Sequence, residues 1–361
     1  MSGLPKKFWH WVSAPIRGAV LFLFSVICLS QQASANFDAT SCQGALDGRS
    51  VGMIVPNQAG GGYDTYGRAV AQALGDIMGV RIPVSNVPSG GGLMAMSLVA
   101  EQTADDVLLY VDGVEEVLNT TDATDLLPFG SDAFEILGIV YTEPEAWIGR
   151  AGLDLSQPSL TELVFSTSSI ESNFVPLVIT AKALGFSFEV VAGYGGSGEA
   201  MAAVLREETD LTTASLTSTL RGAKGGDLEL AMVVSDHPSS KAPTVPPMFG
   251  PGSIFEARAA TWSDAERKER EALVQTVLAL GTTRRAIFTG GRVEANITTC
   301  LRDALDTVLV SETFVAGLEA QGRSVEPVLS SDAQETFLRM RTAFEQHSSV
   351  VSRVRNEFES D

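Results

Sequence analysis

Short apolar runs alternate with amphipathic stretches along the first third of this chain. The run 51–55 is apolar and ends at Pro56, which is typical of a buried strand. Between residues 66 and 77, apolar positions recur at helical spacing, and Gly79 marks the end of that helix. The same alternation predicts strands at 81–87 and 107–111 with a helix at 93–101. Strands that alternate with helices indicate βαβ units and a mainly parallel sheet.

The alternation continues to residue 234. A stretch rich in Pro, Ser and Gly, 236–252, then indicates a linker. Beyond it the chain reads as helical, and the helix headed by Ser263 has Glu266 three residues later, the pattern of a capping box. The remaining strands expected are 136–141, 146–149, 163–166, 186–191, 210–214 and 228–234, and the helices 175–184, 199–206, 295–310, 312–321 and 332–345.

Length and charge narrow the class of protein. A chain of 361 residues favours about two domains. Its formal charge of −19 argues against binding to nucleic acid or to anionic lipid, because both need clustered Lys and Arg.

The first 35 residues have the three parts of a secretory signal peptide. Lys6, Lys7 and Arg17 are positive, 18–30 is apolar, and Ala33–Ala35 is a small-x-small cleavage signal. The alternative is an uncleaved anchor, although the apolar run is short of the ~20 residues that span a membrane. Cleavage would take the formal charge to −22 and leave Cys42 and Cys300 in an oxidising compartment, either paired or as two free thiols.

The loop Pro56–Asp64 carries the strongest candidate chemistry. Its three glycines stand between a strand and a helix, where free N–H groups and the helix dipole form an anion site. Asp64 is expected either to cap this helix or to face the ligand. The spacing fits neither a P-loop nor a dinucleotide fingerprint.

A second glycine-rich loop, Gly193–Glu199, also stands between a strand and a helix. It is either a flexible turn or a second anion-binding loop that faces the first.

Catalytic patterns are sparse: His237 and His347 neighbour no nucleophile, and no metal-binding spacing occurs. We therefore expect no cofactor, no metal and a binding role, with an exported hydrolase as the less favoured alternative.

Two glycine motifs occur in order, Pro56–Asp64 followed by Arg68 and then Val84–Gly92. They resemble the motifs of the tripartite tricarboxylate transporter receptors, the Bug-type extracytoplasmic solute receptors. The similarity spans most of the mature chain except about 250–290. Glu171 and Gly193 depart from the family pattern, which puts the identity of the ligand in doubt. The motifs that carry it are Pro56–Asp64 with Arg68, Val84–Gly92, Gly193–Gly196, Cys300–Leu305 and Phe314–Pro327.

The resemblance implies an α/β fold of the periplasmic binding protein (flytrap) type, with two domains that are each a mainly parallel sheet flanked by helices. Domain 1 would hold 36–142 and 243–361, and domain 2 would hold 143–242. It implies a periplasmic monomer that captures a small carboxylate and delivers it to the large and small membrane subunits of a secondary transporter. A sensory receptor for a carboxylate is the alternative. The implied ligand-binding residues are Asn57, Gly60, Gly61, Gly62, Tyr63, Asp64, Ser168, Ser172, Asn173, Tyr194, Gly195, Gly196, Ser197 and Ser215.

Overall fold

The computed structural model describes residues 37–103, 105–122 and 126–360, so the expected signal peptide lies outside the described residues. The strands are β1 (Ser50–Val55), β2 (Val84–Asn86), β3 (Asp106–Gly113), β4 (Phe134–Arg150), β5 (Glu162–Ser166), β6 (Ser187–Val191), β7 (Leu211–Ser215), β8 (Leu228–Val233) and β9 (Thr282–Gly290). The α-helices are α1 (Ala39–Ala45), α2 (Gly62–Met78), α3 (Leu93–Ala100), α4 (Val114–Asp122), α5 (Ile170–Asn173), α6 (Thr180–Leu184), α7 (Ser197–Leu205), α8 (Leu216–Gly222), α9 (Ile254–Ala259), α10 (Asp264–Leu280), α11 (Ala295–Leu309), α12 (Glu312–Glu319) and α13 (Ser330–Ser360). Shorter turns are η1 (Ser89–Gly92), η2 (Ser131–Ala133), the π-helical η3 (Phe174–Ile179) and η4 (Ala223–Gly225).

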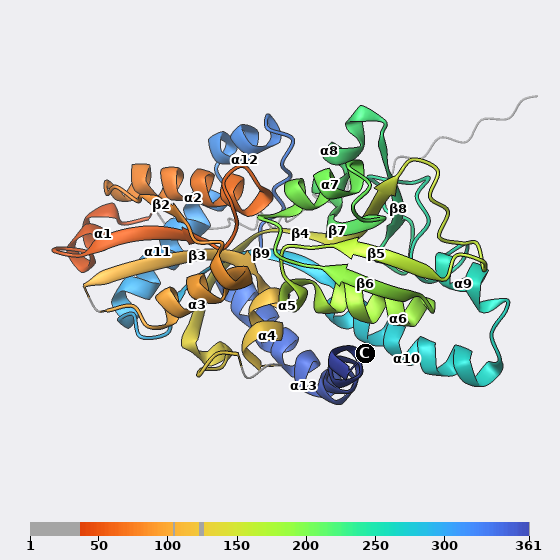
Figure 1. Cartoon of the computed structure of the whole chain (residues 1–361). Helices are drawn as coiled ribbons and strands as arrows, with labels where there is room; N and C mark the ends of the chain where they lie inside the picture. The colour runs from red at the N-terminus through yellow and green to blue at the C-terminus, as the bar shows by residue number, and fades with distance from the viewer. Residues whose placement is uncertain (1–36, 104, 123–125, 361) are drawn as a thin grey trace, which may run out of the picture. The chain divides into compact units, whose positions relative to one another are not determined.

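The first sheet has the order β2-β1-β3-β9-β4 (Figure 1). β1 pairs in parallel with both β2 and β3, so that Ile54 lies opposite Ser85 on one side and Tyr110 on the other. β9 runs antiparallel to its neighbours β3 and β4.

β4 is long enough to belong to two sheets. Its first part, as far as Pro144, pairs with β9, and its second part, from Glu145, pairs with β7 and β8. β7, β5 and β6 follow in parallel and complete the second sheet. In the described part of the chain, four of the five strands of each sheet therefore run in one direction, which confirms the expected α/β class.

Strand alternation explains why helices cover both faces of the first sheet. Met53 and Val55 point to one side, where they pack with α1, α2 and α11, whereas Ile54 points to the other. α3, α4 and α13 cover that second side. The second sheet is likewise covered by α7 and α8 on one face and by η3, α6 and α10 on the other.

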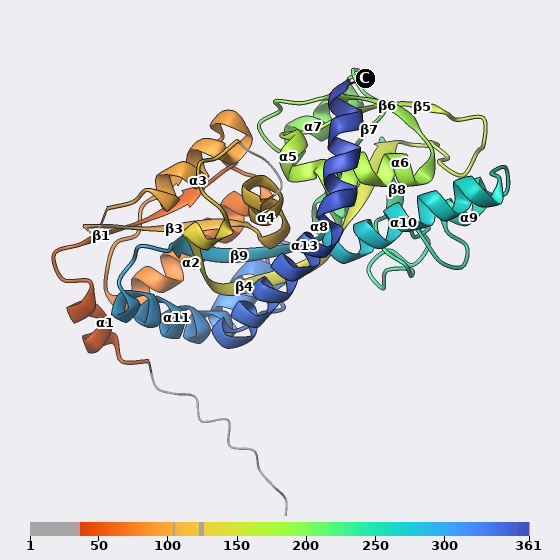
Figure 2. The same ribbon diagram turned by 90° about the horizontal axis from the view of Figure 1, so that it is seen from below.

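α13 links the two helix layers. It packs on β4, α4 and α11, and continues to α10 and η3 (Figure 2). α10 packs on α6 and η3, which cover the second sheet, whereas the expected boundaries place α10 in domain 1. The domain boundaries themselves stay a prediction.

Several elements are not expected from the sequence, among them the helices α1, α4, α8 and α9. No element is expected at 282–290, yet this segment forms β9 between β3 and β4. Arg284 and Arg285 interrupt the apolar pattern of this segment, so the sequence does not predict a buried strand there. Arg285 is nevertheless buried, because it forms an ion pair that the sequence does not reveal. α13 also extends well beyond the expected 332–345. None of the helices in residues 37–360 is both long and apolar enough to cross a membrane.

Cys42 and Cys300 form a disulfide, with their Cα atoms 5.2 Å apart. Cys42 lies on α1 and Cys300 on α11, and both side chains are buried. The bond ties the first described helix to a helix 258 residues further along the chain.

Candidate functional site

The first glycine loop leads from β1 into α2. Gly60 has φ +90°, which a side chain would disfavour, and Gly61 precedes the helix without a side-chain cap. The first N–H groups of this 17-residue helix therefore have no partner within the helix and carry its positive dipole end.

Asp64 holds this loop rather than capping the helix. Its side chain, 5% exposed, forms an ion pair with Arg68 at 2.8 Å. It also accepts hydrogen bonds from the Gly60 N–H at 2.8 Å and from Asn86 Nδ2 at 2.9 Å. Burial opposes the effect, but these donors lower the pKa of Asp64. The capping residue is Gly61, so the expected N-cap role is wrong.

The second glycine loop lies between β6 and α7 and touches the first. The Gln58 N–H donates to the Gly195 carbonyl at 3.0 Å. The approach is close, because a Cβ at Gly195 would lie 2.0 Å from Gln58 Cδ. The two loops thus meet at the mouth of one pocket.

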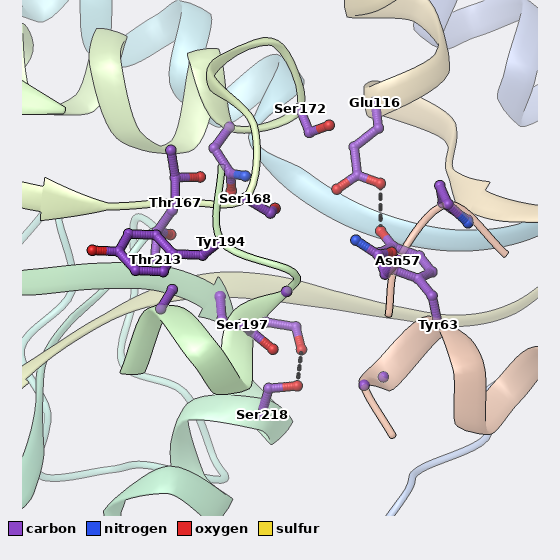
Figure 3. A pocket seen from close by; sticks show the side chains of 18 of the residues that line it. Asn57, Tyr63, Glu116, Thr167, Ser168, Ser172, Tyr194, Ser197, Thr213 and Ser218 are labelled. Carbon is purple, nitrogen blue, oxygen red and sulfur yellow. Dashed lines mark hydrogen bonds between the residues drawn. The ribbon is translucent and has the colours of Figure 1, made fainter. Parts of the chain in front are cut away.

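The pocket, a cavity of about 90 Å³, lies between elements of the two sheets (Figure 3). A single water needs only ~10–15 Å³, so a small molecule fits. Gly60 and Asp64 are not among the lining residues. The expected residues that line it are Asn57, Gly61, Gly62, Tyr63, Ser168, Ser172, Asn173, Tyr194, Gly195, Gly196, Ser197 and Ser215.

Other lining residues come from elements that sequence analysis did not connect with the site. Neutral polar groups from the second sheet and its loops are Thr167, Thr212, Thr213 and Ser218. The Ser215 hydroxyl donates to Ser218 Oγ at 3.1 Å, on the side of the pocket opposite Glu116 (Figure 3). The charged lining residues are Asp112, Glu116, Glu145 and Arg285.

Asp112 and Glu116 form an acidic wall beside the first glycine loop. The Tyr63 hydroxyl donates to Glu116 Oε2 at 2.7 Å, as Figure 3 shows, and Tyr110 donates to Asp112. Burial, and then the charge of Glu116, raise the pKa of Asp112 well above its usual value. The Tyr63 pKa is raised for the same two reasons.

Glu145 extends this wall onto β4. It is 6% exposed and accepts hydrogen bonds from the hydroxyls of Thr283 and Thr213. Burial raises the pKa of Glu145 to about 7. Among the residues that the structure describes, none of these three acidic groups forms an ion pair, although the charge of Arg285 opposes the raised pKa of Glu145.

Arg285, on β9, adds a positively charged side chain to the pocket lining. It pairs with Glu143, and the two side chains are 4% and 1% exposed. Thr217 donates its N–H and its hydroxyl to Glu143 at 2.7 and 2.6 Å. Burial opposes the effect, but Glu143 raises the Arg285 pKa. Arg285 Nε is buried without a hydrogen-bond partner.

A second buried arginine, Arg323, lies beside Arg285 at the start of α2. Arg323 is 1% exposed, and its Nε and Nη2 atoms have no hydrogen-bond partner. Burial, and then the charges of Arg221 and Arg285, lower the Arg323 pKa to about 10. A Cβ on Gly62 would lie 3.5 Å from Arg323 Nη1 and 3.6 Å from Arg285 Nη2, so both guanidinium groups lie at the start of α2. This end of the site carries unmatched positive charge.

These charged groups are not expected from the sequence, for reasons that differ between them. Asp112 directly follows the expected strand 107–111, and the carboxyl ends of neighbouring parallel strands share one edge, so that signal was available. Glu145 falls between two stretches that turned out to be one strand. Arg285 could not be placed, because β9 itself was not expected.

The two histidines among the described residues, His237 and His347, do not line the pocket. His237 is 78% exposed beside Asp236, and His347 Nδ1 lies 2.9 Å from the Thr276 hydroxyl. In residues 37–103, 105–122 and 126–360, no group of three or more His, Cys, Asp or Glu side chains is arranged to hold a metal ion.

No protein-family model matches this chain. Two curated relatives do: a UPF0065 protein in the TAR-I ttuE-ttuC' intergenic region of Agrobacterium vitis is 25% identical over 59% of this chain, and a UPF0065 protein of Bordetella pertussis is 23% identical over 55%. The match spans 64% of the length of each relative.

Solved structures match over more of the chain. MatC of Rhodopseudomonas palustris with bound malate has a TM-score of 0.63 at 16% identity, covering 85% of this chain and 98% of that one. Another R. palustris protein, solved with adipate, has a TM-score of 0.63 at 16% identity, covering 85% and 97%. A TctC solute binding protein from Polaromonas has a TM-score of 0.55 at 17% identity, covering 86% and 99%. The chain has the fold of these solute-binding proteins.

The lining of the candidate site comes from elements and loops of both sheets.

Proposed function

We propose that this chain is a Bug-type extracytoplasmic solute receptor that captures a small carboxylate. The observation that carries the proposal is the meeting of two glycine-rich loops at one pocket, joined by the Gln58 to Gly195 hydrogen bond. Each loop leads into a helix, α2 or α7, whose first N–H groups suit a carboxylate. The malate and adipate of the structural relatives are carboxylates of suitable size.

The acidic net charge does not oppose this proposal. Exposed charges more than about 10 Å away are screened at physiological salt, whereas dipoles that converge inside a pocket are not. Arg285 adds one positive group to the lining. The local field at the loops therefore outweighs the formal charge of −19.

The same proposal covers the setting of the protein. Residues 1–35 would direct export to the periplasm and be cleaved, leaving a monomer with domains 36–142 plus 243–361 and 143–242. The receptor would deliver its ligand to the large and small membrane subunits of a tripartite tricarboxylate-type secondary transporter, and it would catalyse no reaction.

A thermal-shift screen tests the function. The exported protein is unfolded and refolded to remove carried ligand, and is then mixed with carboxylates, sugars and amines that lack a carboxylate. A ligand at 100 times its Kd adds about 2.7 kcal/mol of stability, enough to raise the Tm by a few degrees. We expect shifts only with compounds that contain a carboxylate. Shifts confined to sugars or simple amines would contradict the proposal.

Variants of the loops connect the shift to this site. Ser197 lines the pocket, whereas Ser348, on α13, does not. Ser197→Ala should weaken binding of the responding carboxylate, and Ser348→Ala should leave it unchanged. Equal behaviour of the two variants would place the binding elsewhere.

A further inference from the structure

Two buried glutamates stand on either side of the point where β4 passes from the first sheet to the second. β4 pairs with β9 as far as Pro144 and with β7 from Glu145. Glu143 and Glu145 therefore flank this crossing, and because they are two residues apart their side chains leave the same face of the strand. Both side chains are buried.

Glu143 divides its two carboxylate oxygens between the sheets. Its Oε1 accepts a hydrogen bond from Arg285 of β9, in the first sheet. Its Oε2 accepts from the N–H and the hydroxyl of Thr217, at 2.7 and 2.6 Å, in the helix α8 that covers the second sheet. Hydrogen bonds to an ionised group are about twice as strong as those between neutral groups. Glu143 is thus bonded strongly to both sides of the crossing.

Glu145 repeats this division. Its Oε1 accepts from the hydroxyl of Thr283, on β9. Its Oε2 accepts from the hydroxyl of Thr213, on β7, at 3.4 Å. Each glutamate therefore has one oxygen bonded to the first sheet and the other bonded to the second. We name the two glutamates and their partners the β4 clamp, which consists of Glu143, Glu145, Thr213, Thr217, Thr283 and Arg285.

Backbone pairing alone defines the angle at this crossing only weakly. The pairing with β9 ends at Pro144, which has no N–H to donate, and a single strand can twist between two sheets. A rotation of the second sheet about this point would pull Thr213 and Thr217 away from carboxylates that β9 holds in place. A buried oxygen that loses its donor costs free energy, so the clamp opposes such a rotation.

We infer that Glu143 and Glu145 are positioning residues that fix the orientation of the second sheet relative to the first. Three members of the clamp also line the pocket, namely Glu145, Thr213 and Arg285. The clamp therefore sets the spacing between the pocket walls that the two sheets supply. It would do so whatever ligand the pocket binds, and in this respect it goes beyond the proposed function.

A pair of spin labels measures this orientation. Gln72 is exposed on α2, which covers the first sheet, and Leu205 is 49% exposed at the end of α7, which covers the second. Gln72→Cys and Leu205→Cys carry the nitroxide labels, while Cys42 and Cys300 stay in their disulfide. Double electron–electron resonance on the refolded exported protein, without ligand, gives the distribution of distances between the labels.

Two threonines of the clamp lie outside the pocket lining and are the ones to change. Thr217→Val combined with Thr283→Val removes one hydroxyl donor from each glutamate and keeps a β-branched side chain at both positions. We expect the distance distribution of this double variant to shift or broaden by about 2 Å or more, which exceeds the ~1 Å of local backbone adjustment.

The matched control makes the same two substitutions on the same two elements. Thr219, on α8, donates to the Leu216 carbonyl at 2.9 Å, and Thr289, on β9, donates to the Leu108 carbonyl at 3.0 Å. Each of these bonds stays on one side of the crossing, and both threonines are buried. Thr219→Val combined with Thr289→Val loses two buried hydrogen bonds as well, but should keep the distance distribution of the parent protein.

Three results would overturn the inference. The first is an unchanged distribution in Thr217→Val with Thr283→Val, and the second is an equal change in the control, which would indicate general loosening. Thr217→Ser with Thr283→Ser keeps both hydroxyls and should match the parent, so a distribution as broad as that of the valine variant is the third.

A milder variant and the absence of ligand keep the test decisive. If the double valine variant does not fold, Thr217→Val alone retains the N–H bond to Glu143, and its distribution is compared with that of Thr219→Val. The distances are measured without ligand, so a failure of the clamp leaves the carboxylate receptor standing. A failure of carboxylate binding in the thermal-shift screen would likewise leave the clamp standing.

Discussion

Buried ionisable side chains dominate the site at the scale of single residues. Glu143 and Glu145 are two residues apart on β4, but their surroundings shift them in opposite directions. Arg285 and Thr217 lower the pKa of Glu143 against the effect of burial. Glu145 has hydroxyl partners only, and burial raises its pKa to about 7. Local partners, rather than residue type, therefore set the charge at each position.

The raised pKa of Glu145 predicts a pH-dependent stability. The folded protein keeps a proton that the unfolded chain releases near the ordinary value of 4.5, so this contribution is complete at low pH and is lost as pH rises to about 7. In Glu145→Gln the free energy of unfolding should fall less steeply from pH 5 to 7, as measured by urea denaturation without ligand. Glu335→Gln is the control, and a slope identical in all three proteins would contradict the prediction.

The Glu143–Arg285 pair predicts a large asymmetry between single and double variants. Glu143→Gln leaves Arg285 buried without its counter-charge, and breaking a buried pair in this way costs about 3–5 kcal/mol. Glu143→Leu combined with Arg285→Met removes both charges and should cost less than Glu143→Gln alone. Urea denaturation measures both, and a double variant that is less stable than the single one would count against this account.

At the scale of elements, the site depends on two loops that no single sheet could bring together. The first loop follows β1 in one sheet and the second follows β6 in the other. Their contact is made by backbone atoms of Gln58 and Gly195. A side chain at position 195 would meet the end of the Gln58 side chain, which would have to move.

The loop contact predicts a rescue. Gly195→Ala should displace the end of the Gln58 side chain and weaken ligand binding by up to about 1 kcal/mol, at the low end of the 1–3 kcal/mol that overpacking costs in a core, because a flexible side chain can move aside. Adding Gln58→Ala should restore part of the affinity. Gly198→Ala has open space around its Cβ and should bind normally in calorimetry. Equal affinity of Gly195→Ala and the parent protein would show that the approach is not tight.

The disulfide predicts a role for α1 in stability. Replacing both Cys42 and Cys300 by Ser should lower the free energy of unfolding by about 2–5 kcal/mol, because the bond restricts the unfolded chain. A reductant should lower the stability of the parent protein by a similar amount and leave the double variant unchanged. Sensitivity of the double variant to the reductant would assign the effect to something else.

At the scale of the whole molecule, α13 connects the helix layers of the two sheets. Arg355 lies over the Phe174 ring, with its guanidinium carbon 4.0 Å from the centroid, and Lys182 pairs with Glu357 at 3.0 Å. Phe358 stacks on Phe188 with ring centroids 6.0 Å apart. The C-terminal end of α13 therefore stabilises elements of the second sheet, while the earlier part of the helix packs on the first sheet.

This arrangement predicts that a change near the C-terminus affects the second sheet. Phe358→Ala should cost about 1–3 kcal/mol and increase hydrogen exchange in η3 and β6. Leu338→Ala, on the same helix at a side chain 52% exposed, should change little. Exchange that rises only within α13 would mean that the contact does not support β6.

The sequence by itself determined the local chemistry of the glycine loops. Glycines between an apolar run and an amphipathic helix predict a strand-loop-helix unit. The family resemblance of these loops implied Asn57, Tyr63 and Ser197 as site residues, and all three line the pocket. The backbone conformation of these loops depends mostly on neighbours in the chain. The α/β alternation was readable for the same reason.

Only the tertiary structure decided the charges that line the pocket. Glu145 and Arg285 come from β4 and β9, and they meet Asp112, at the end of β3, because β9 inserts between β3 and β4. A charged side chain looks like a surface residue in a sequence, and its burial depends on partners that are distant along the chain. Sheet order and strand crossing bring those partners together, and local periodicity carries no information about either.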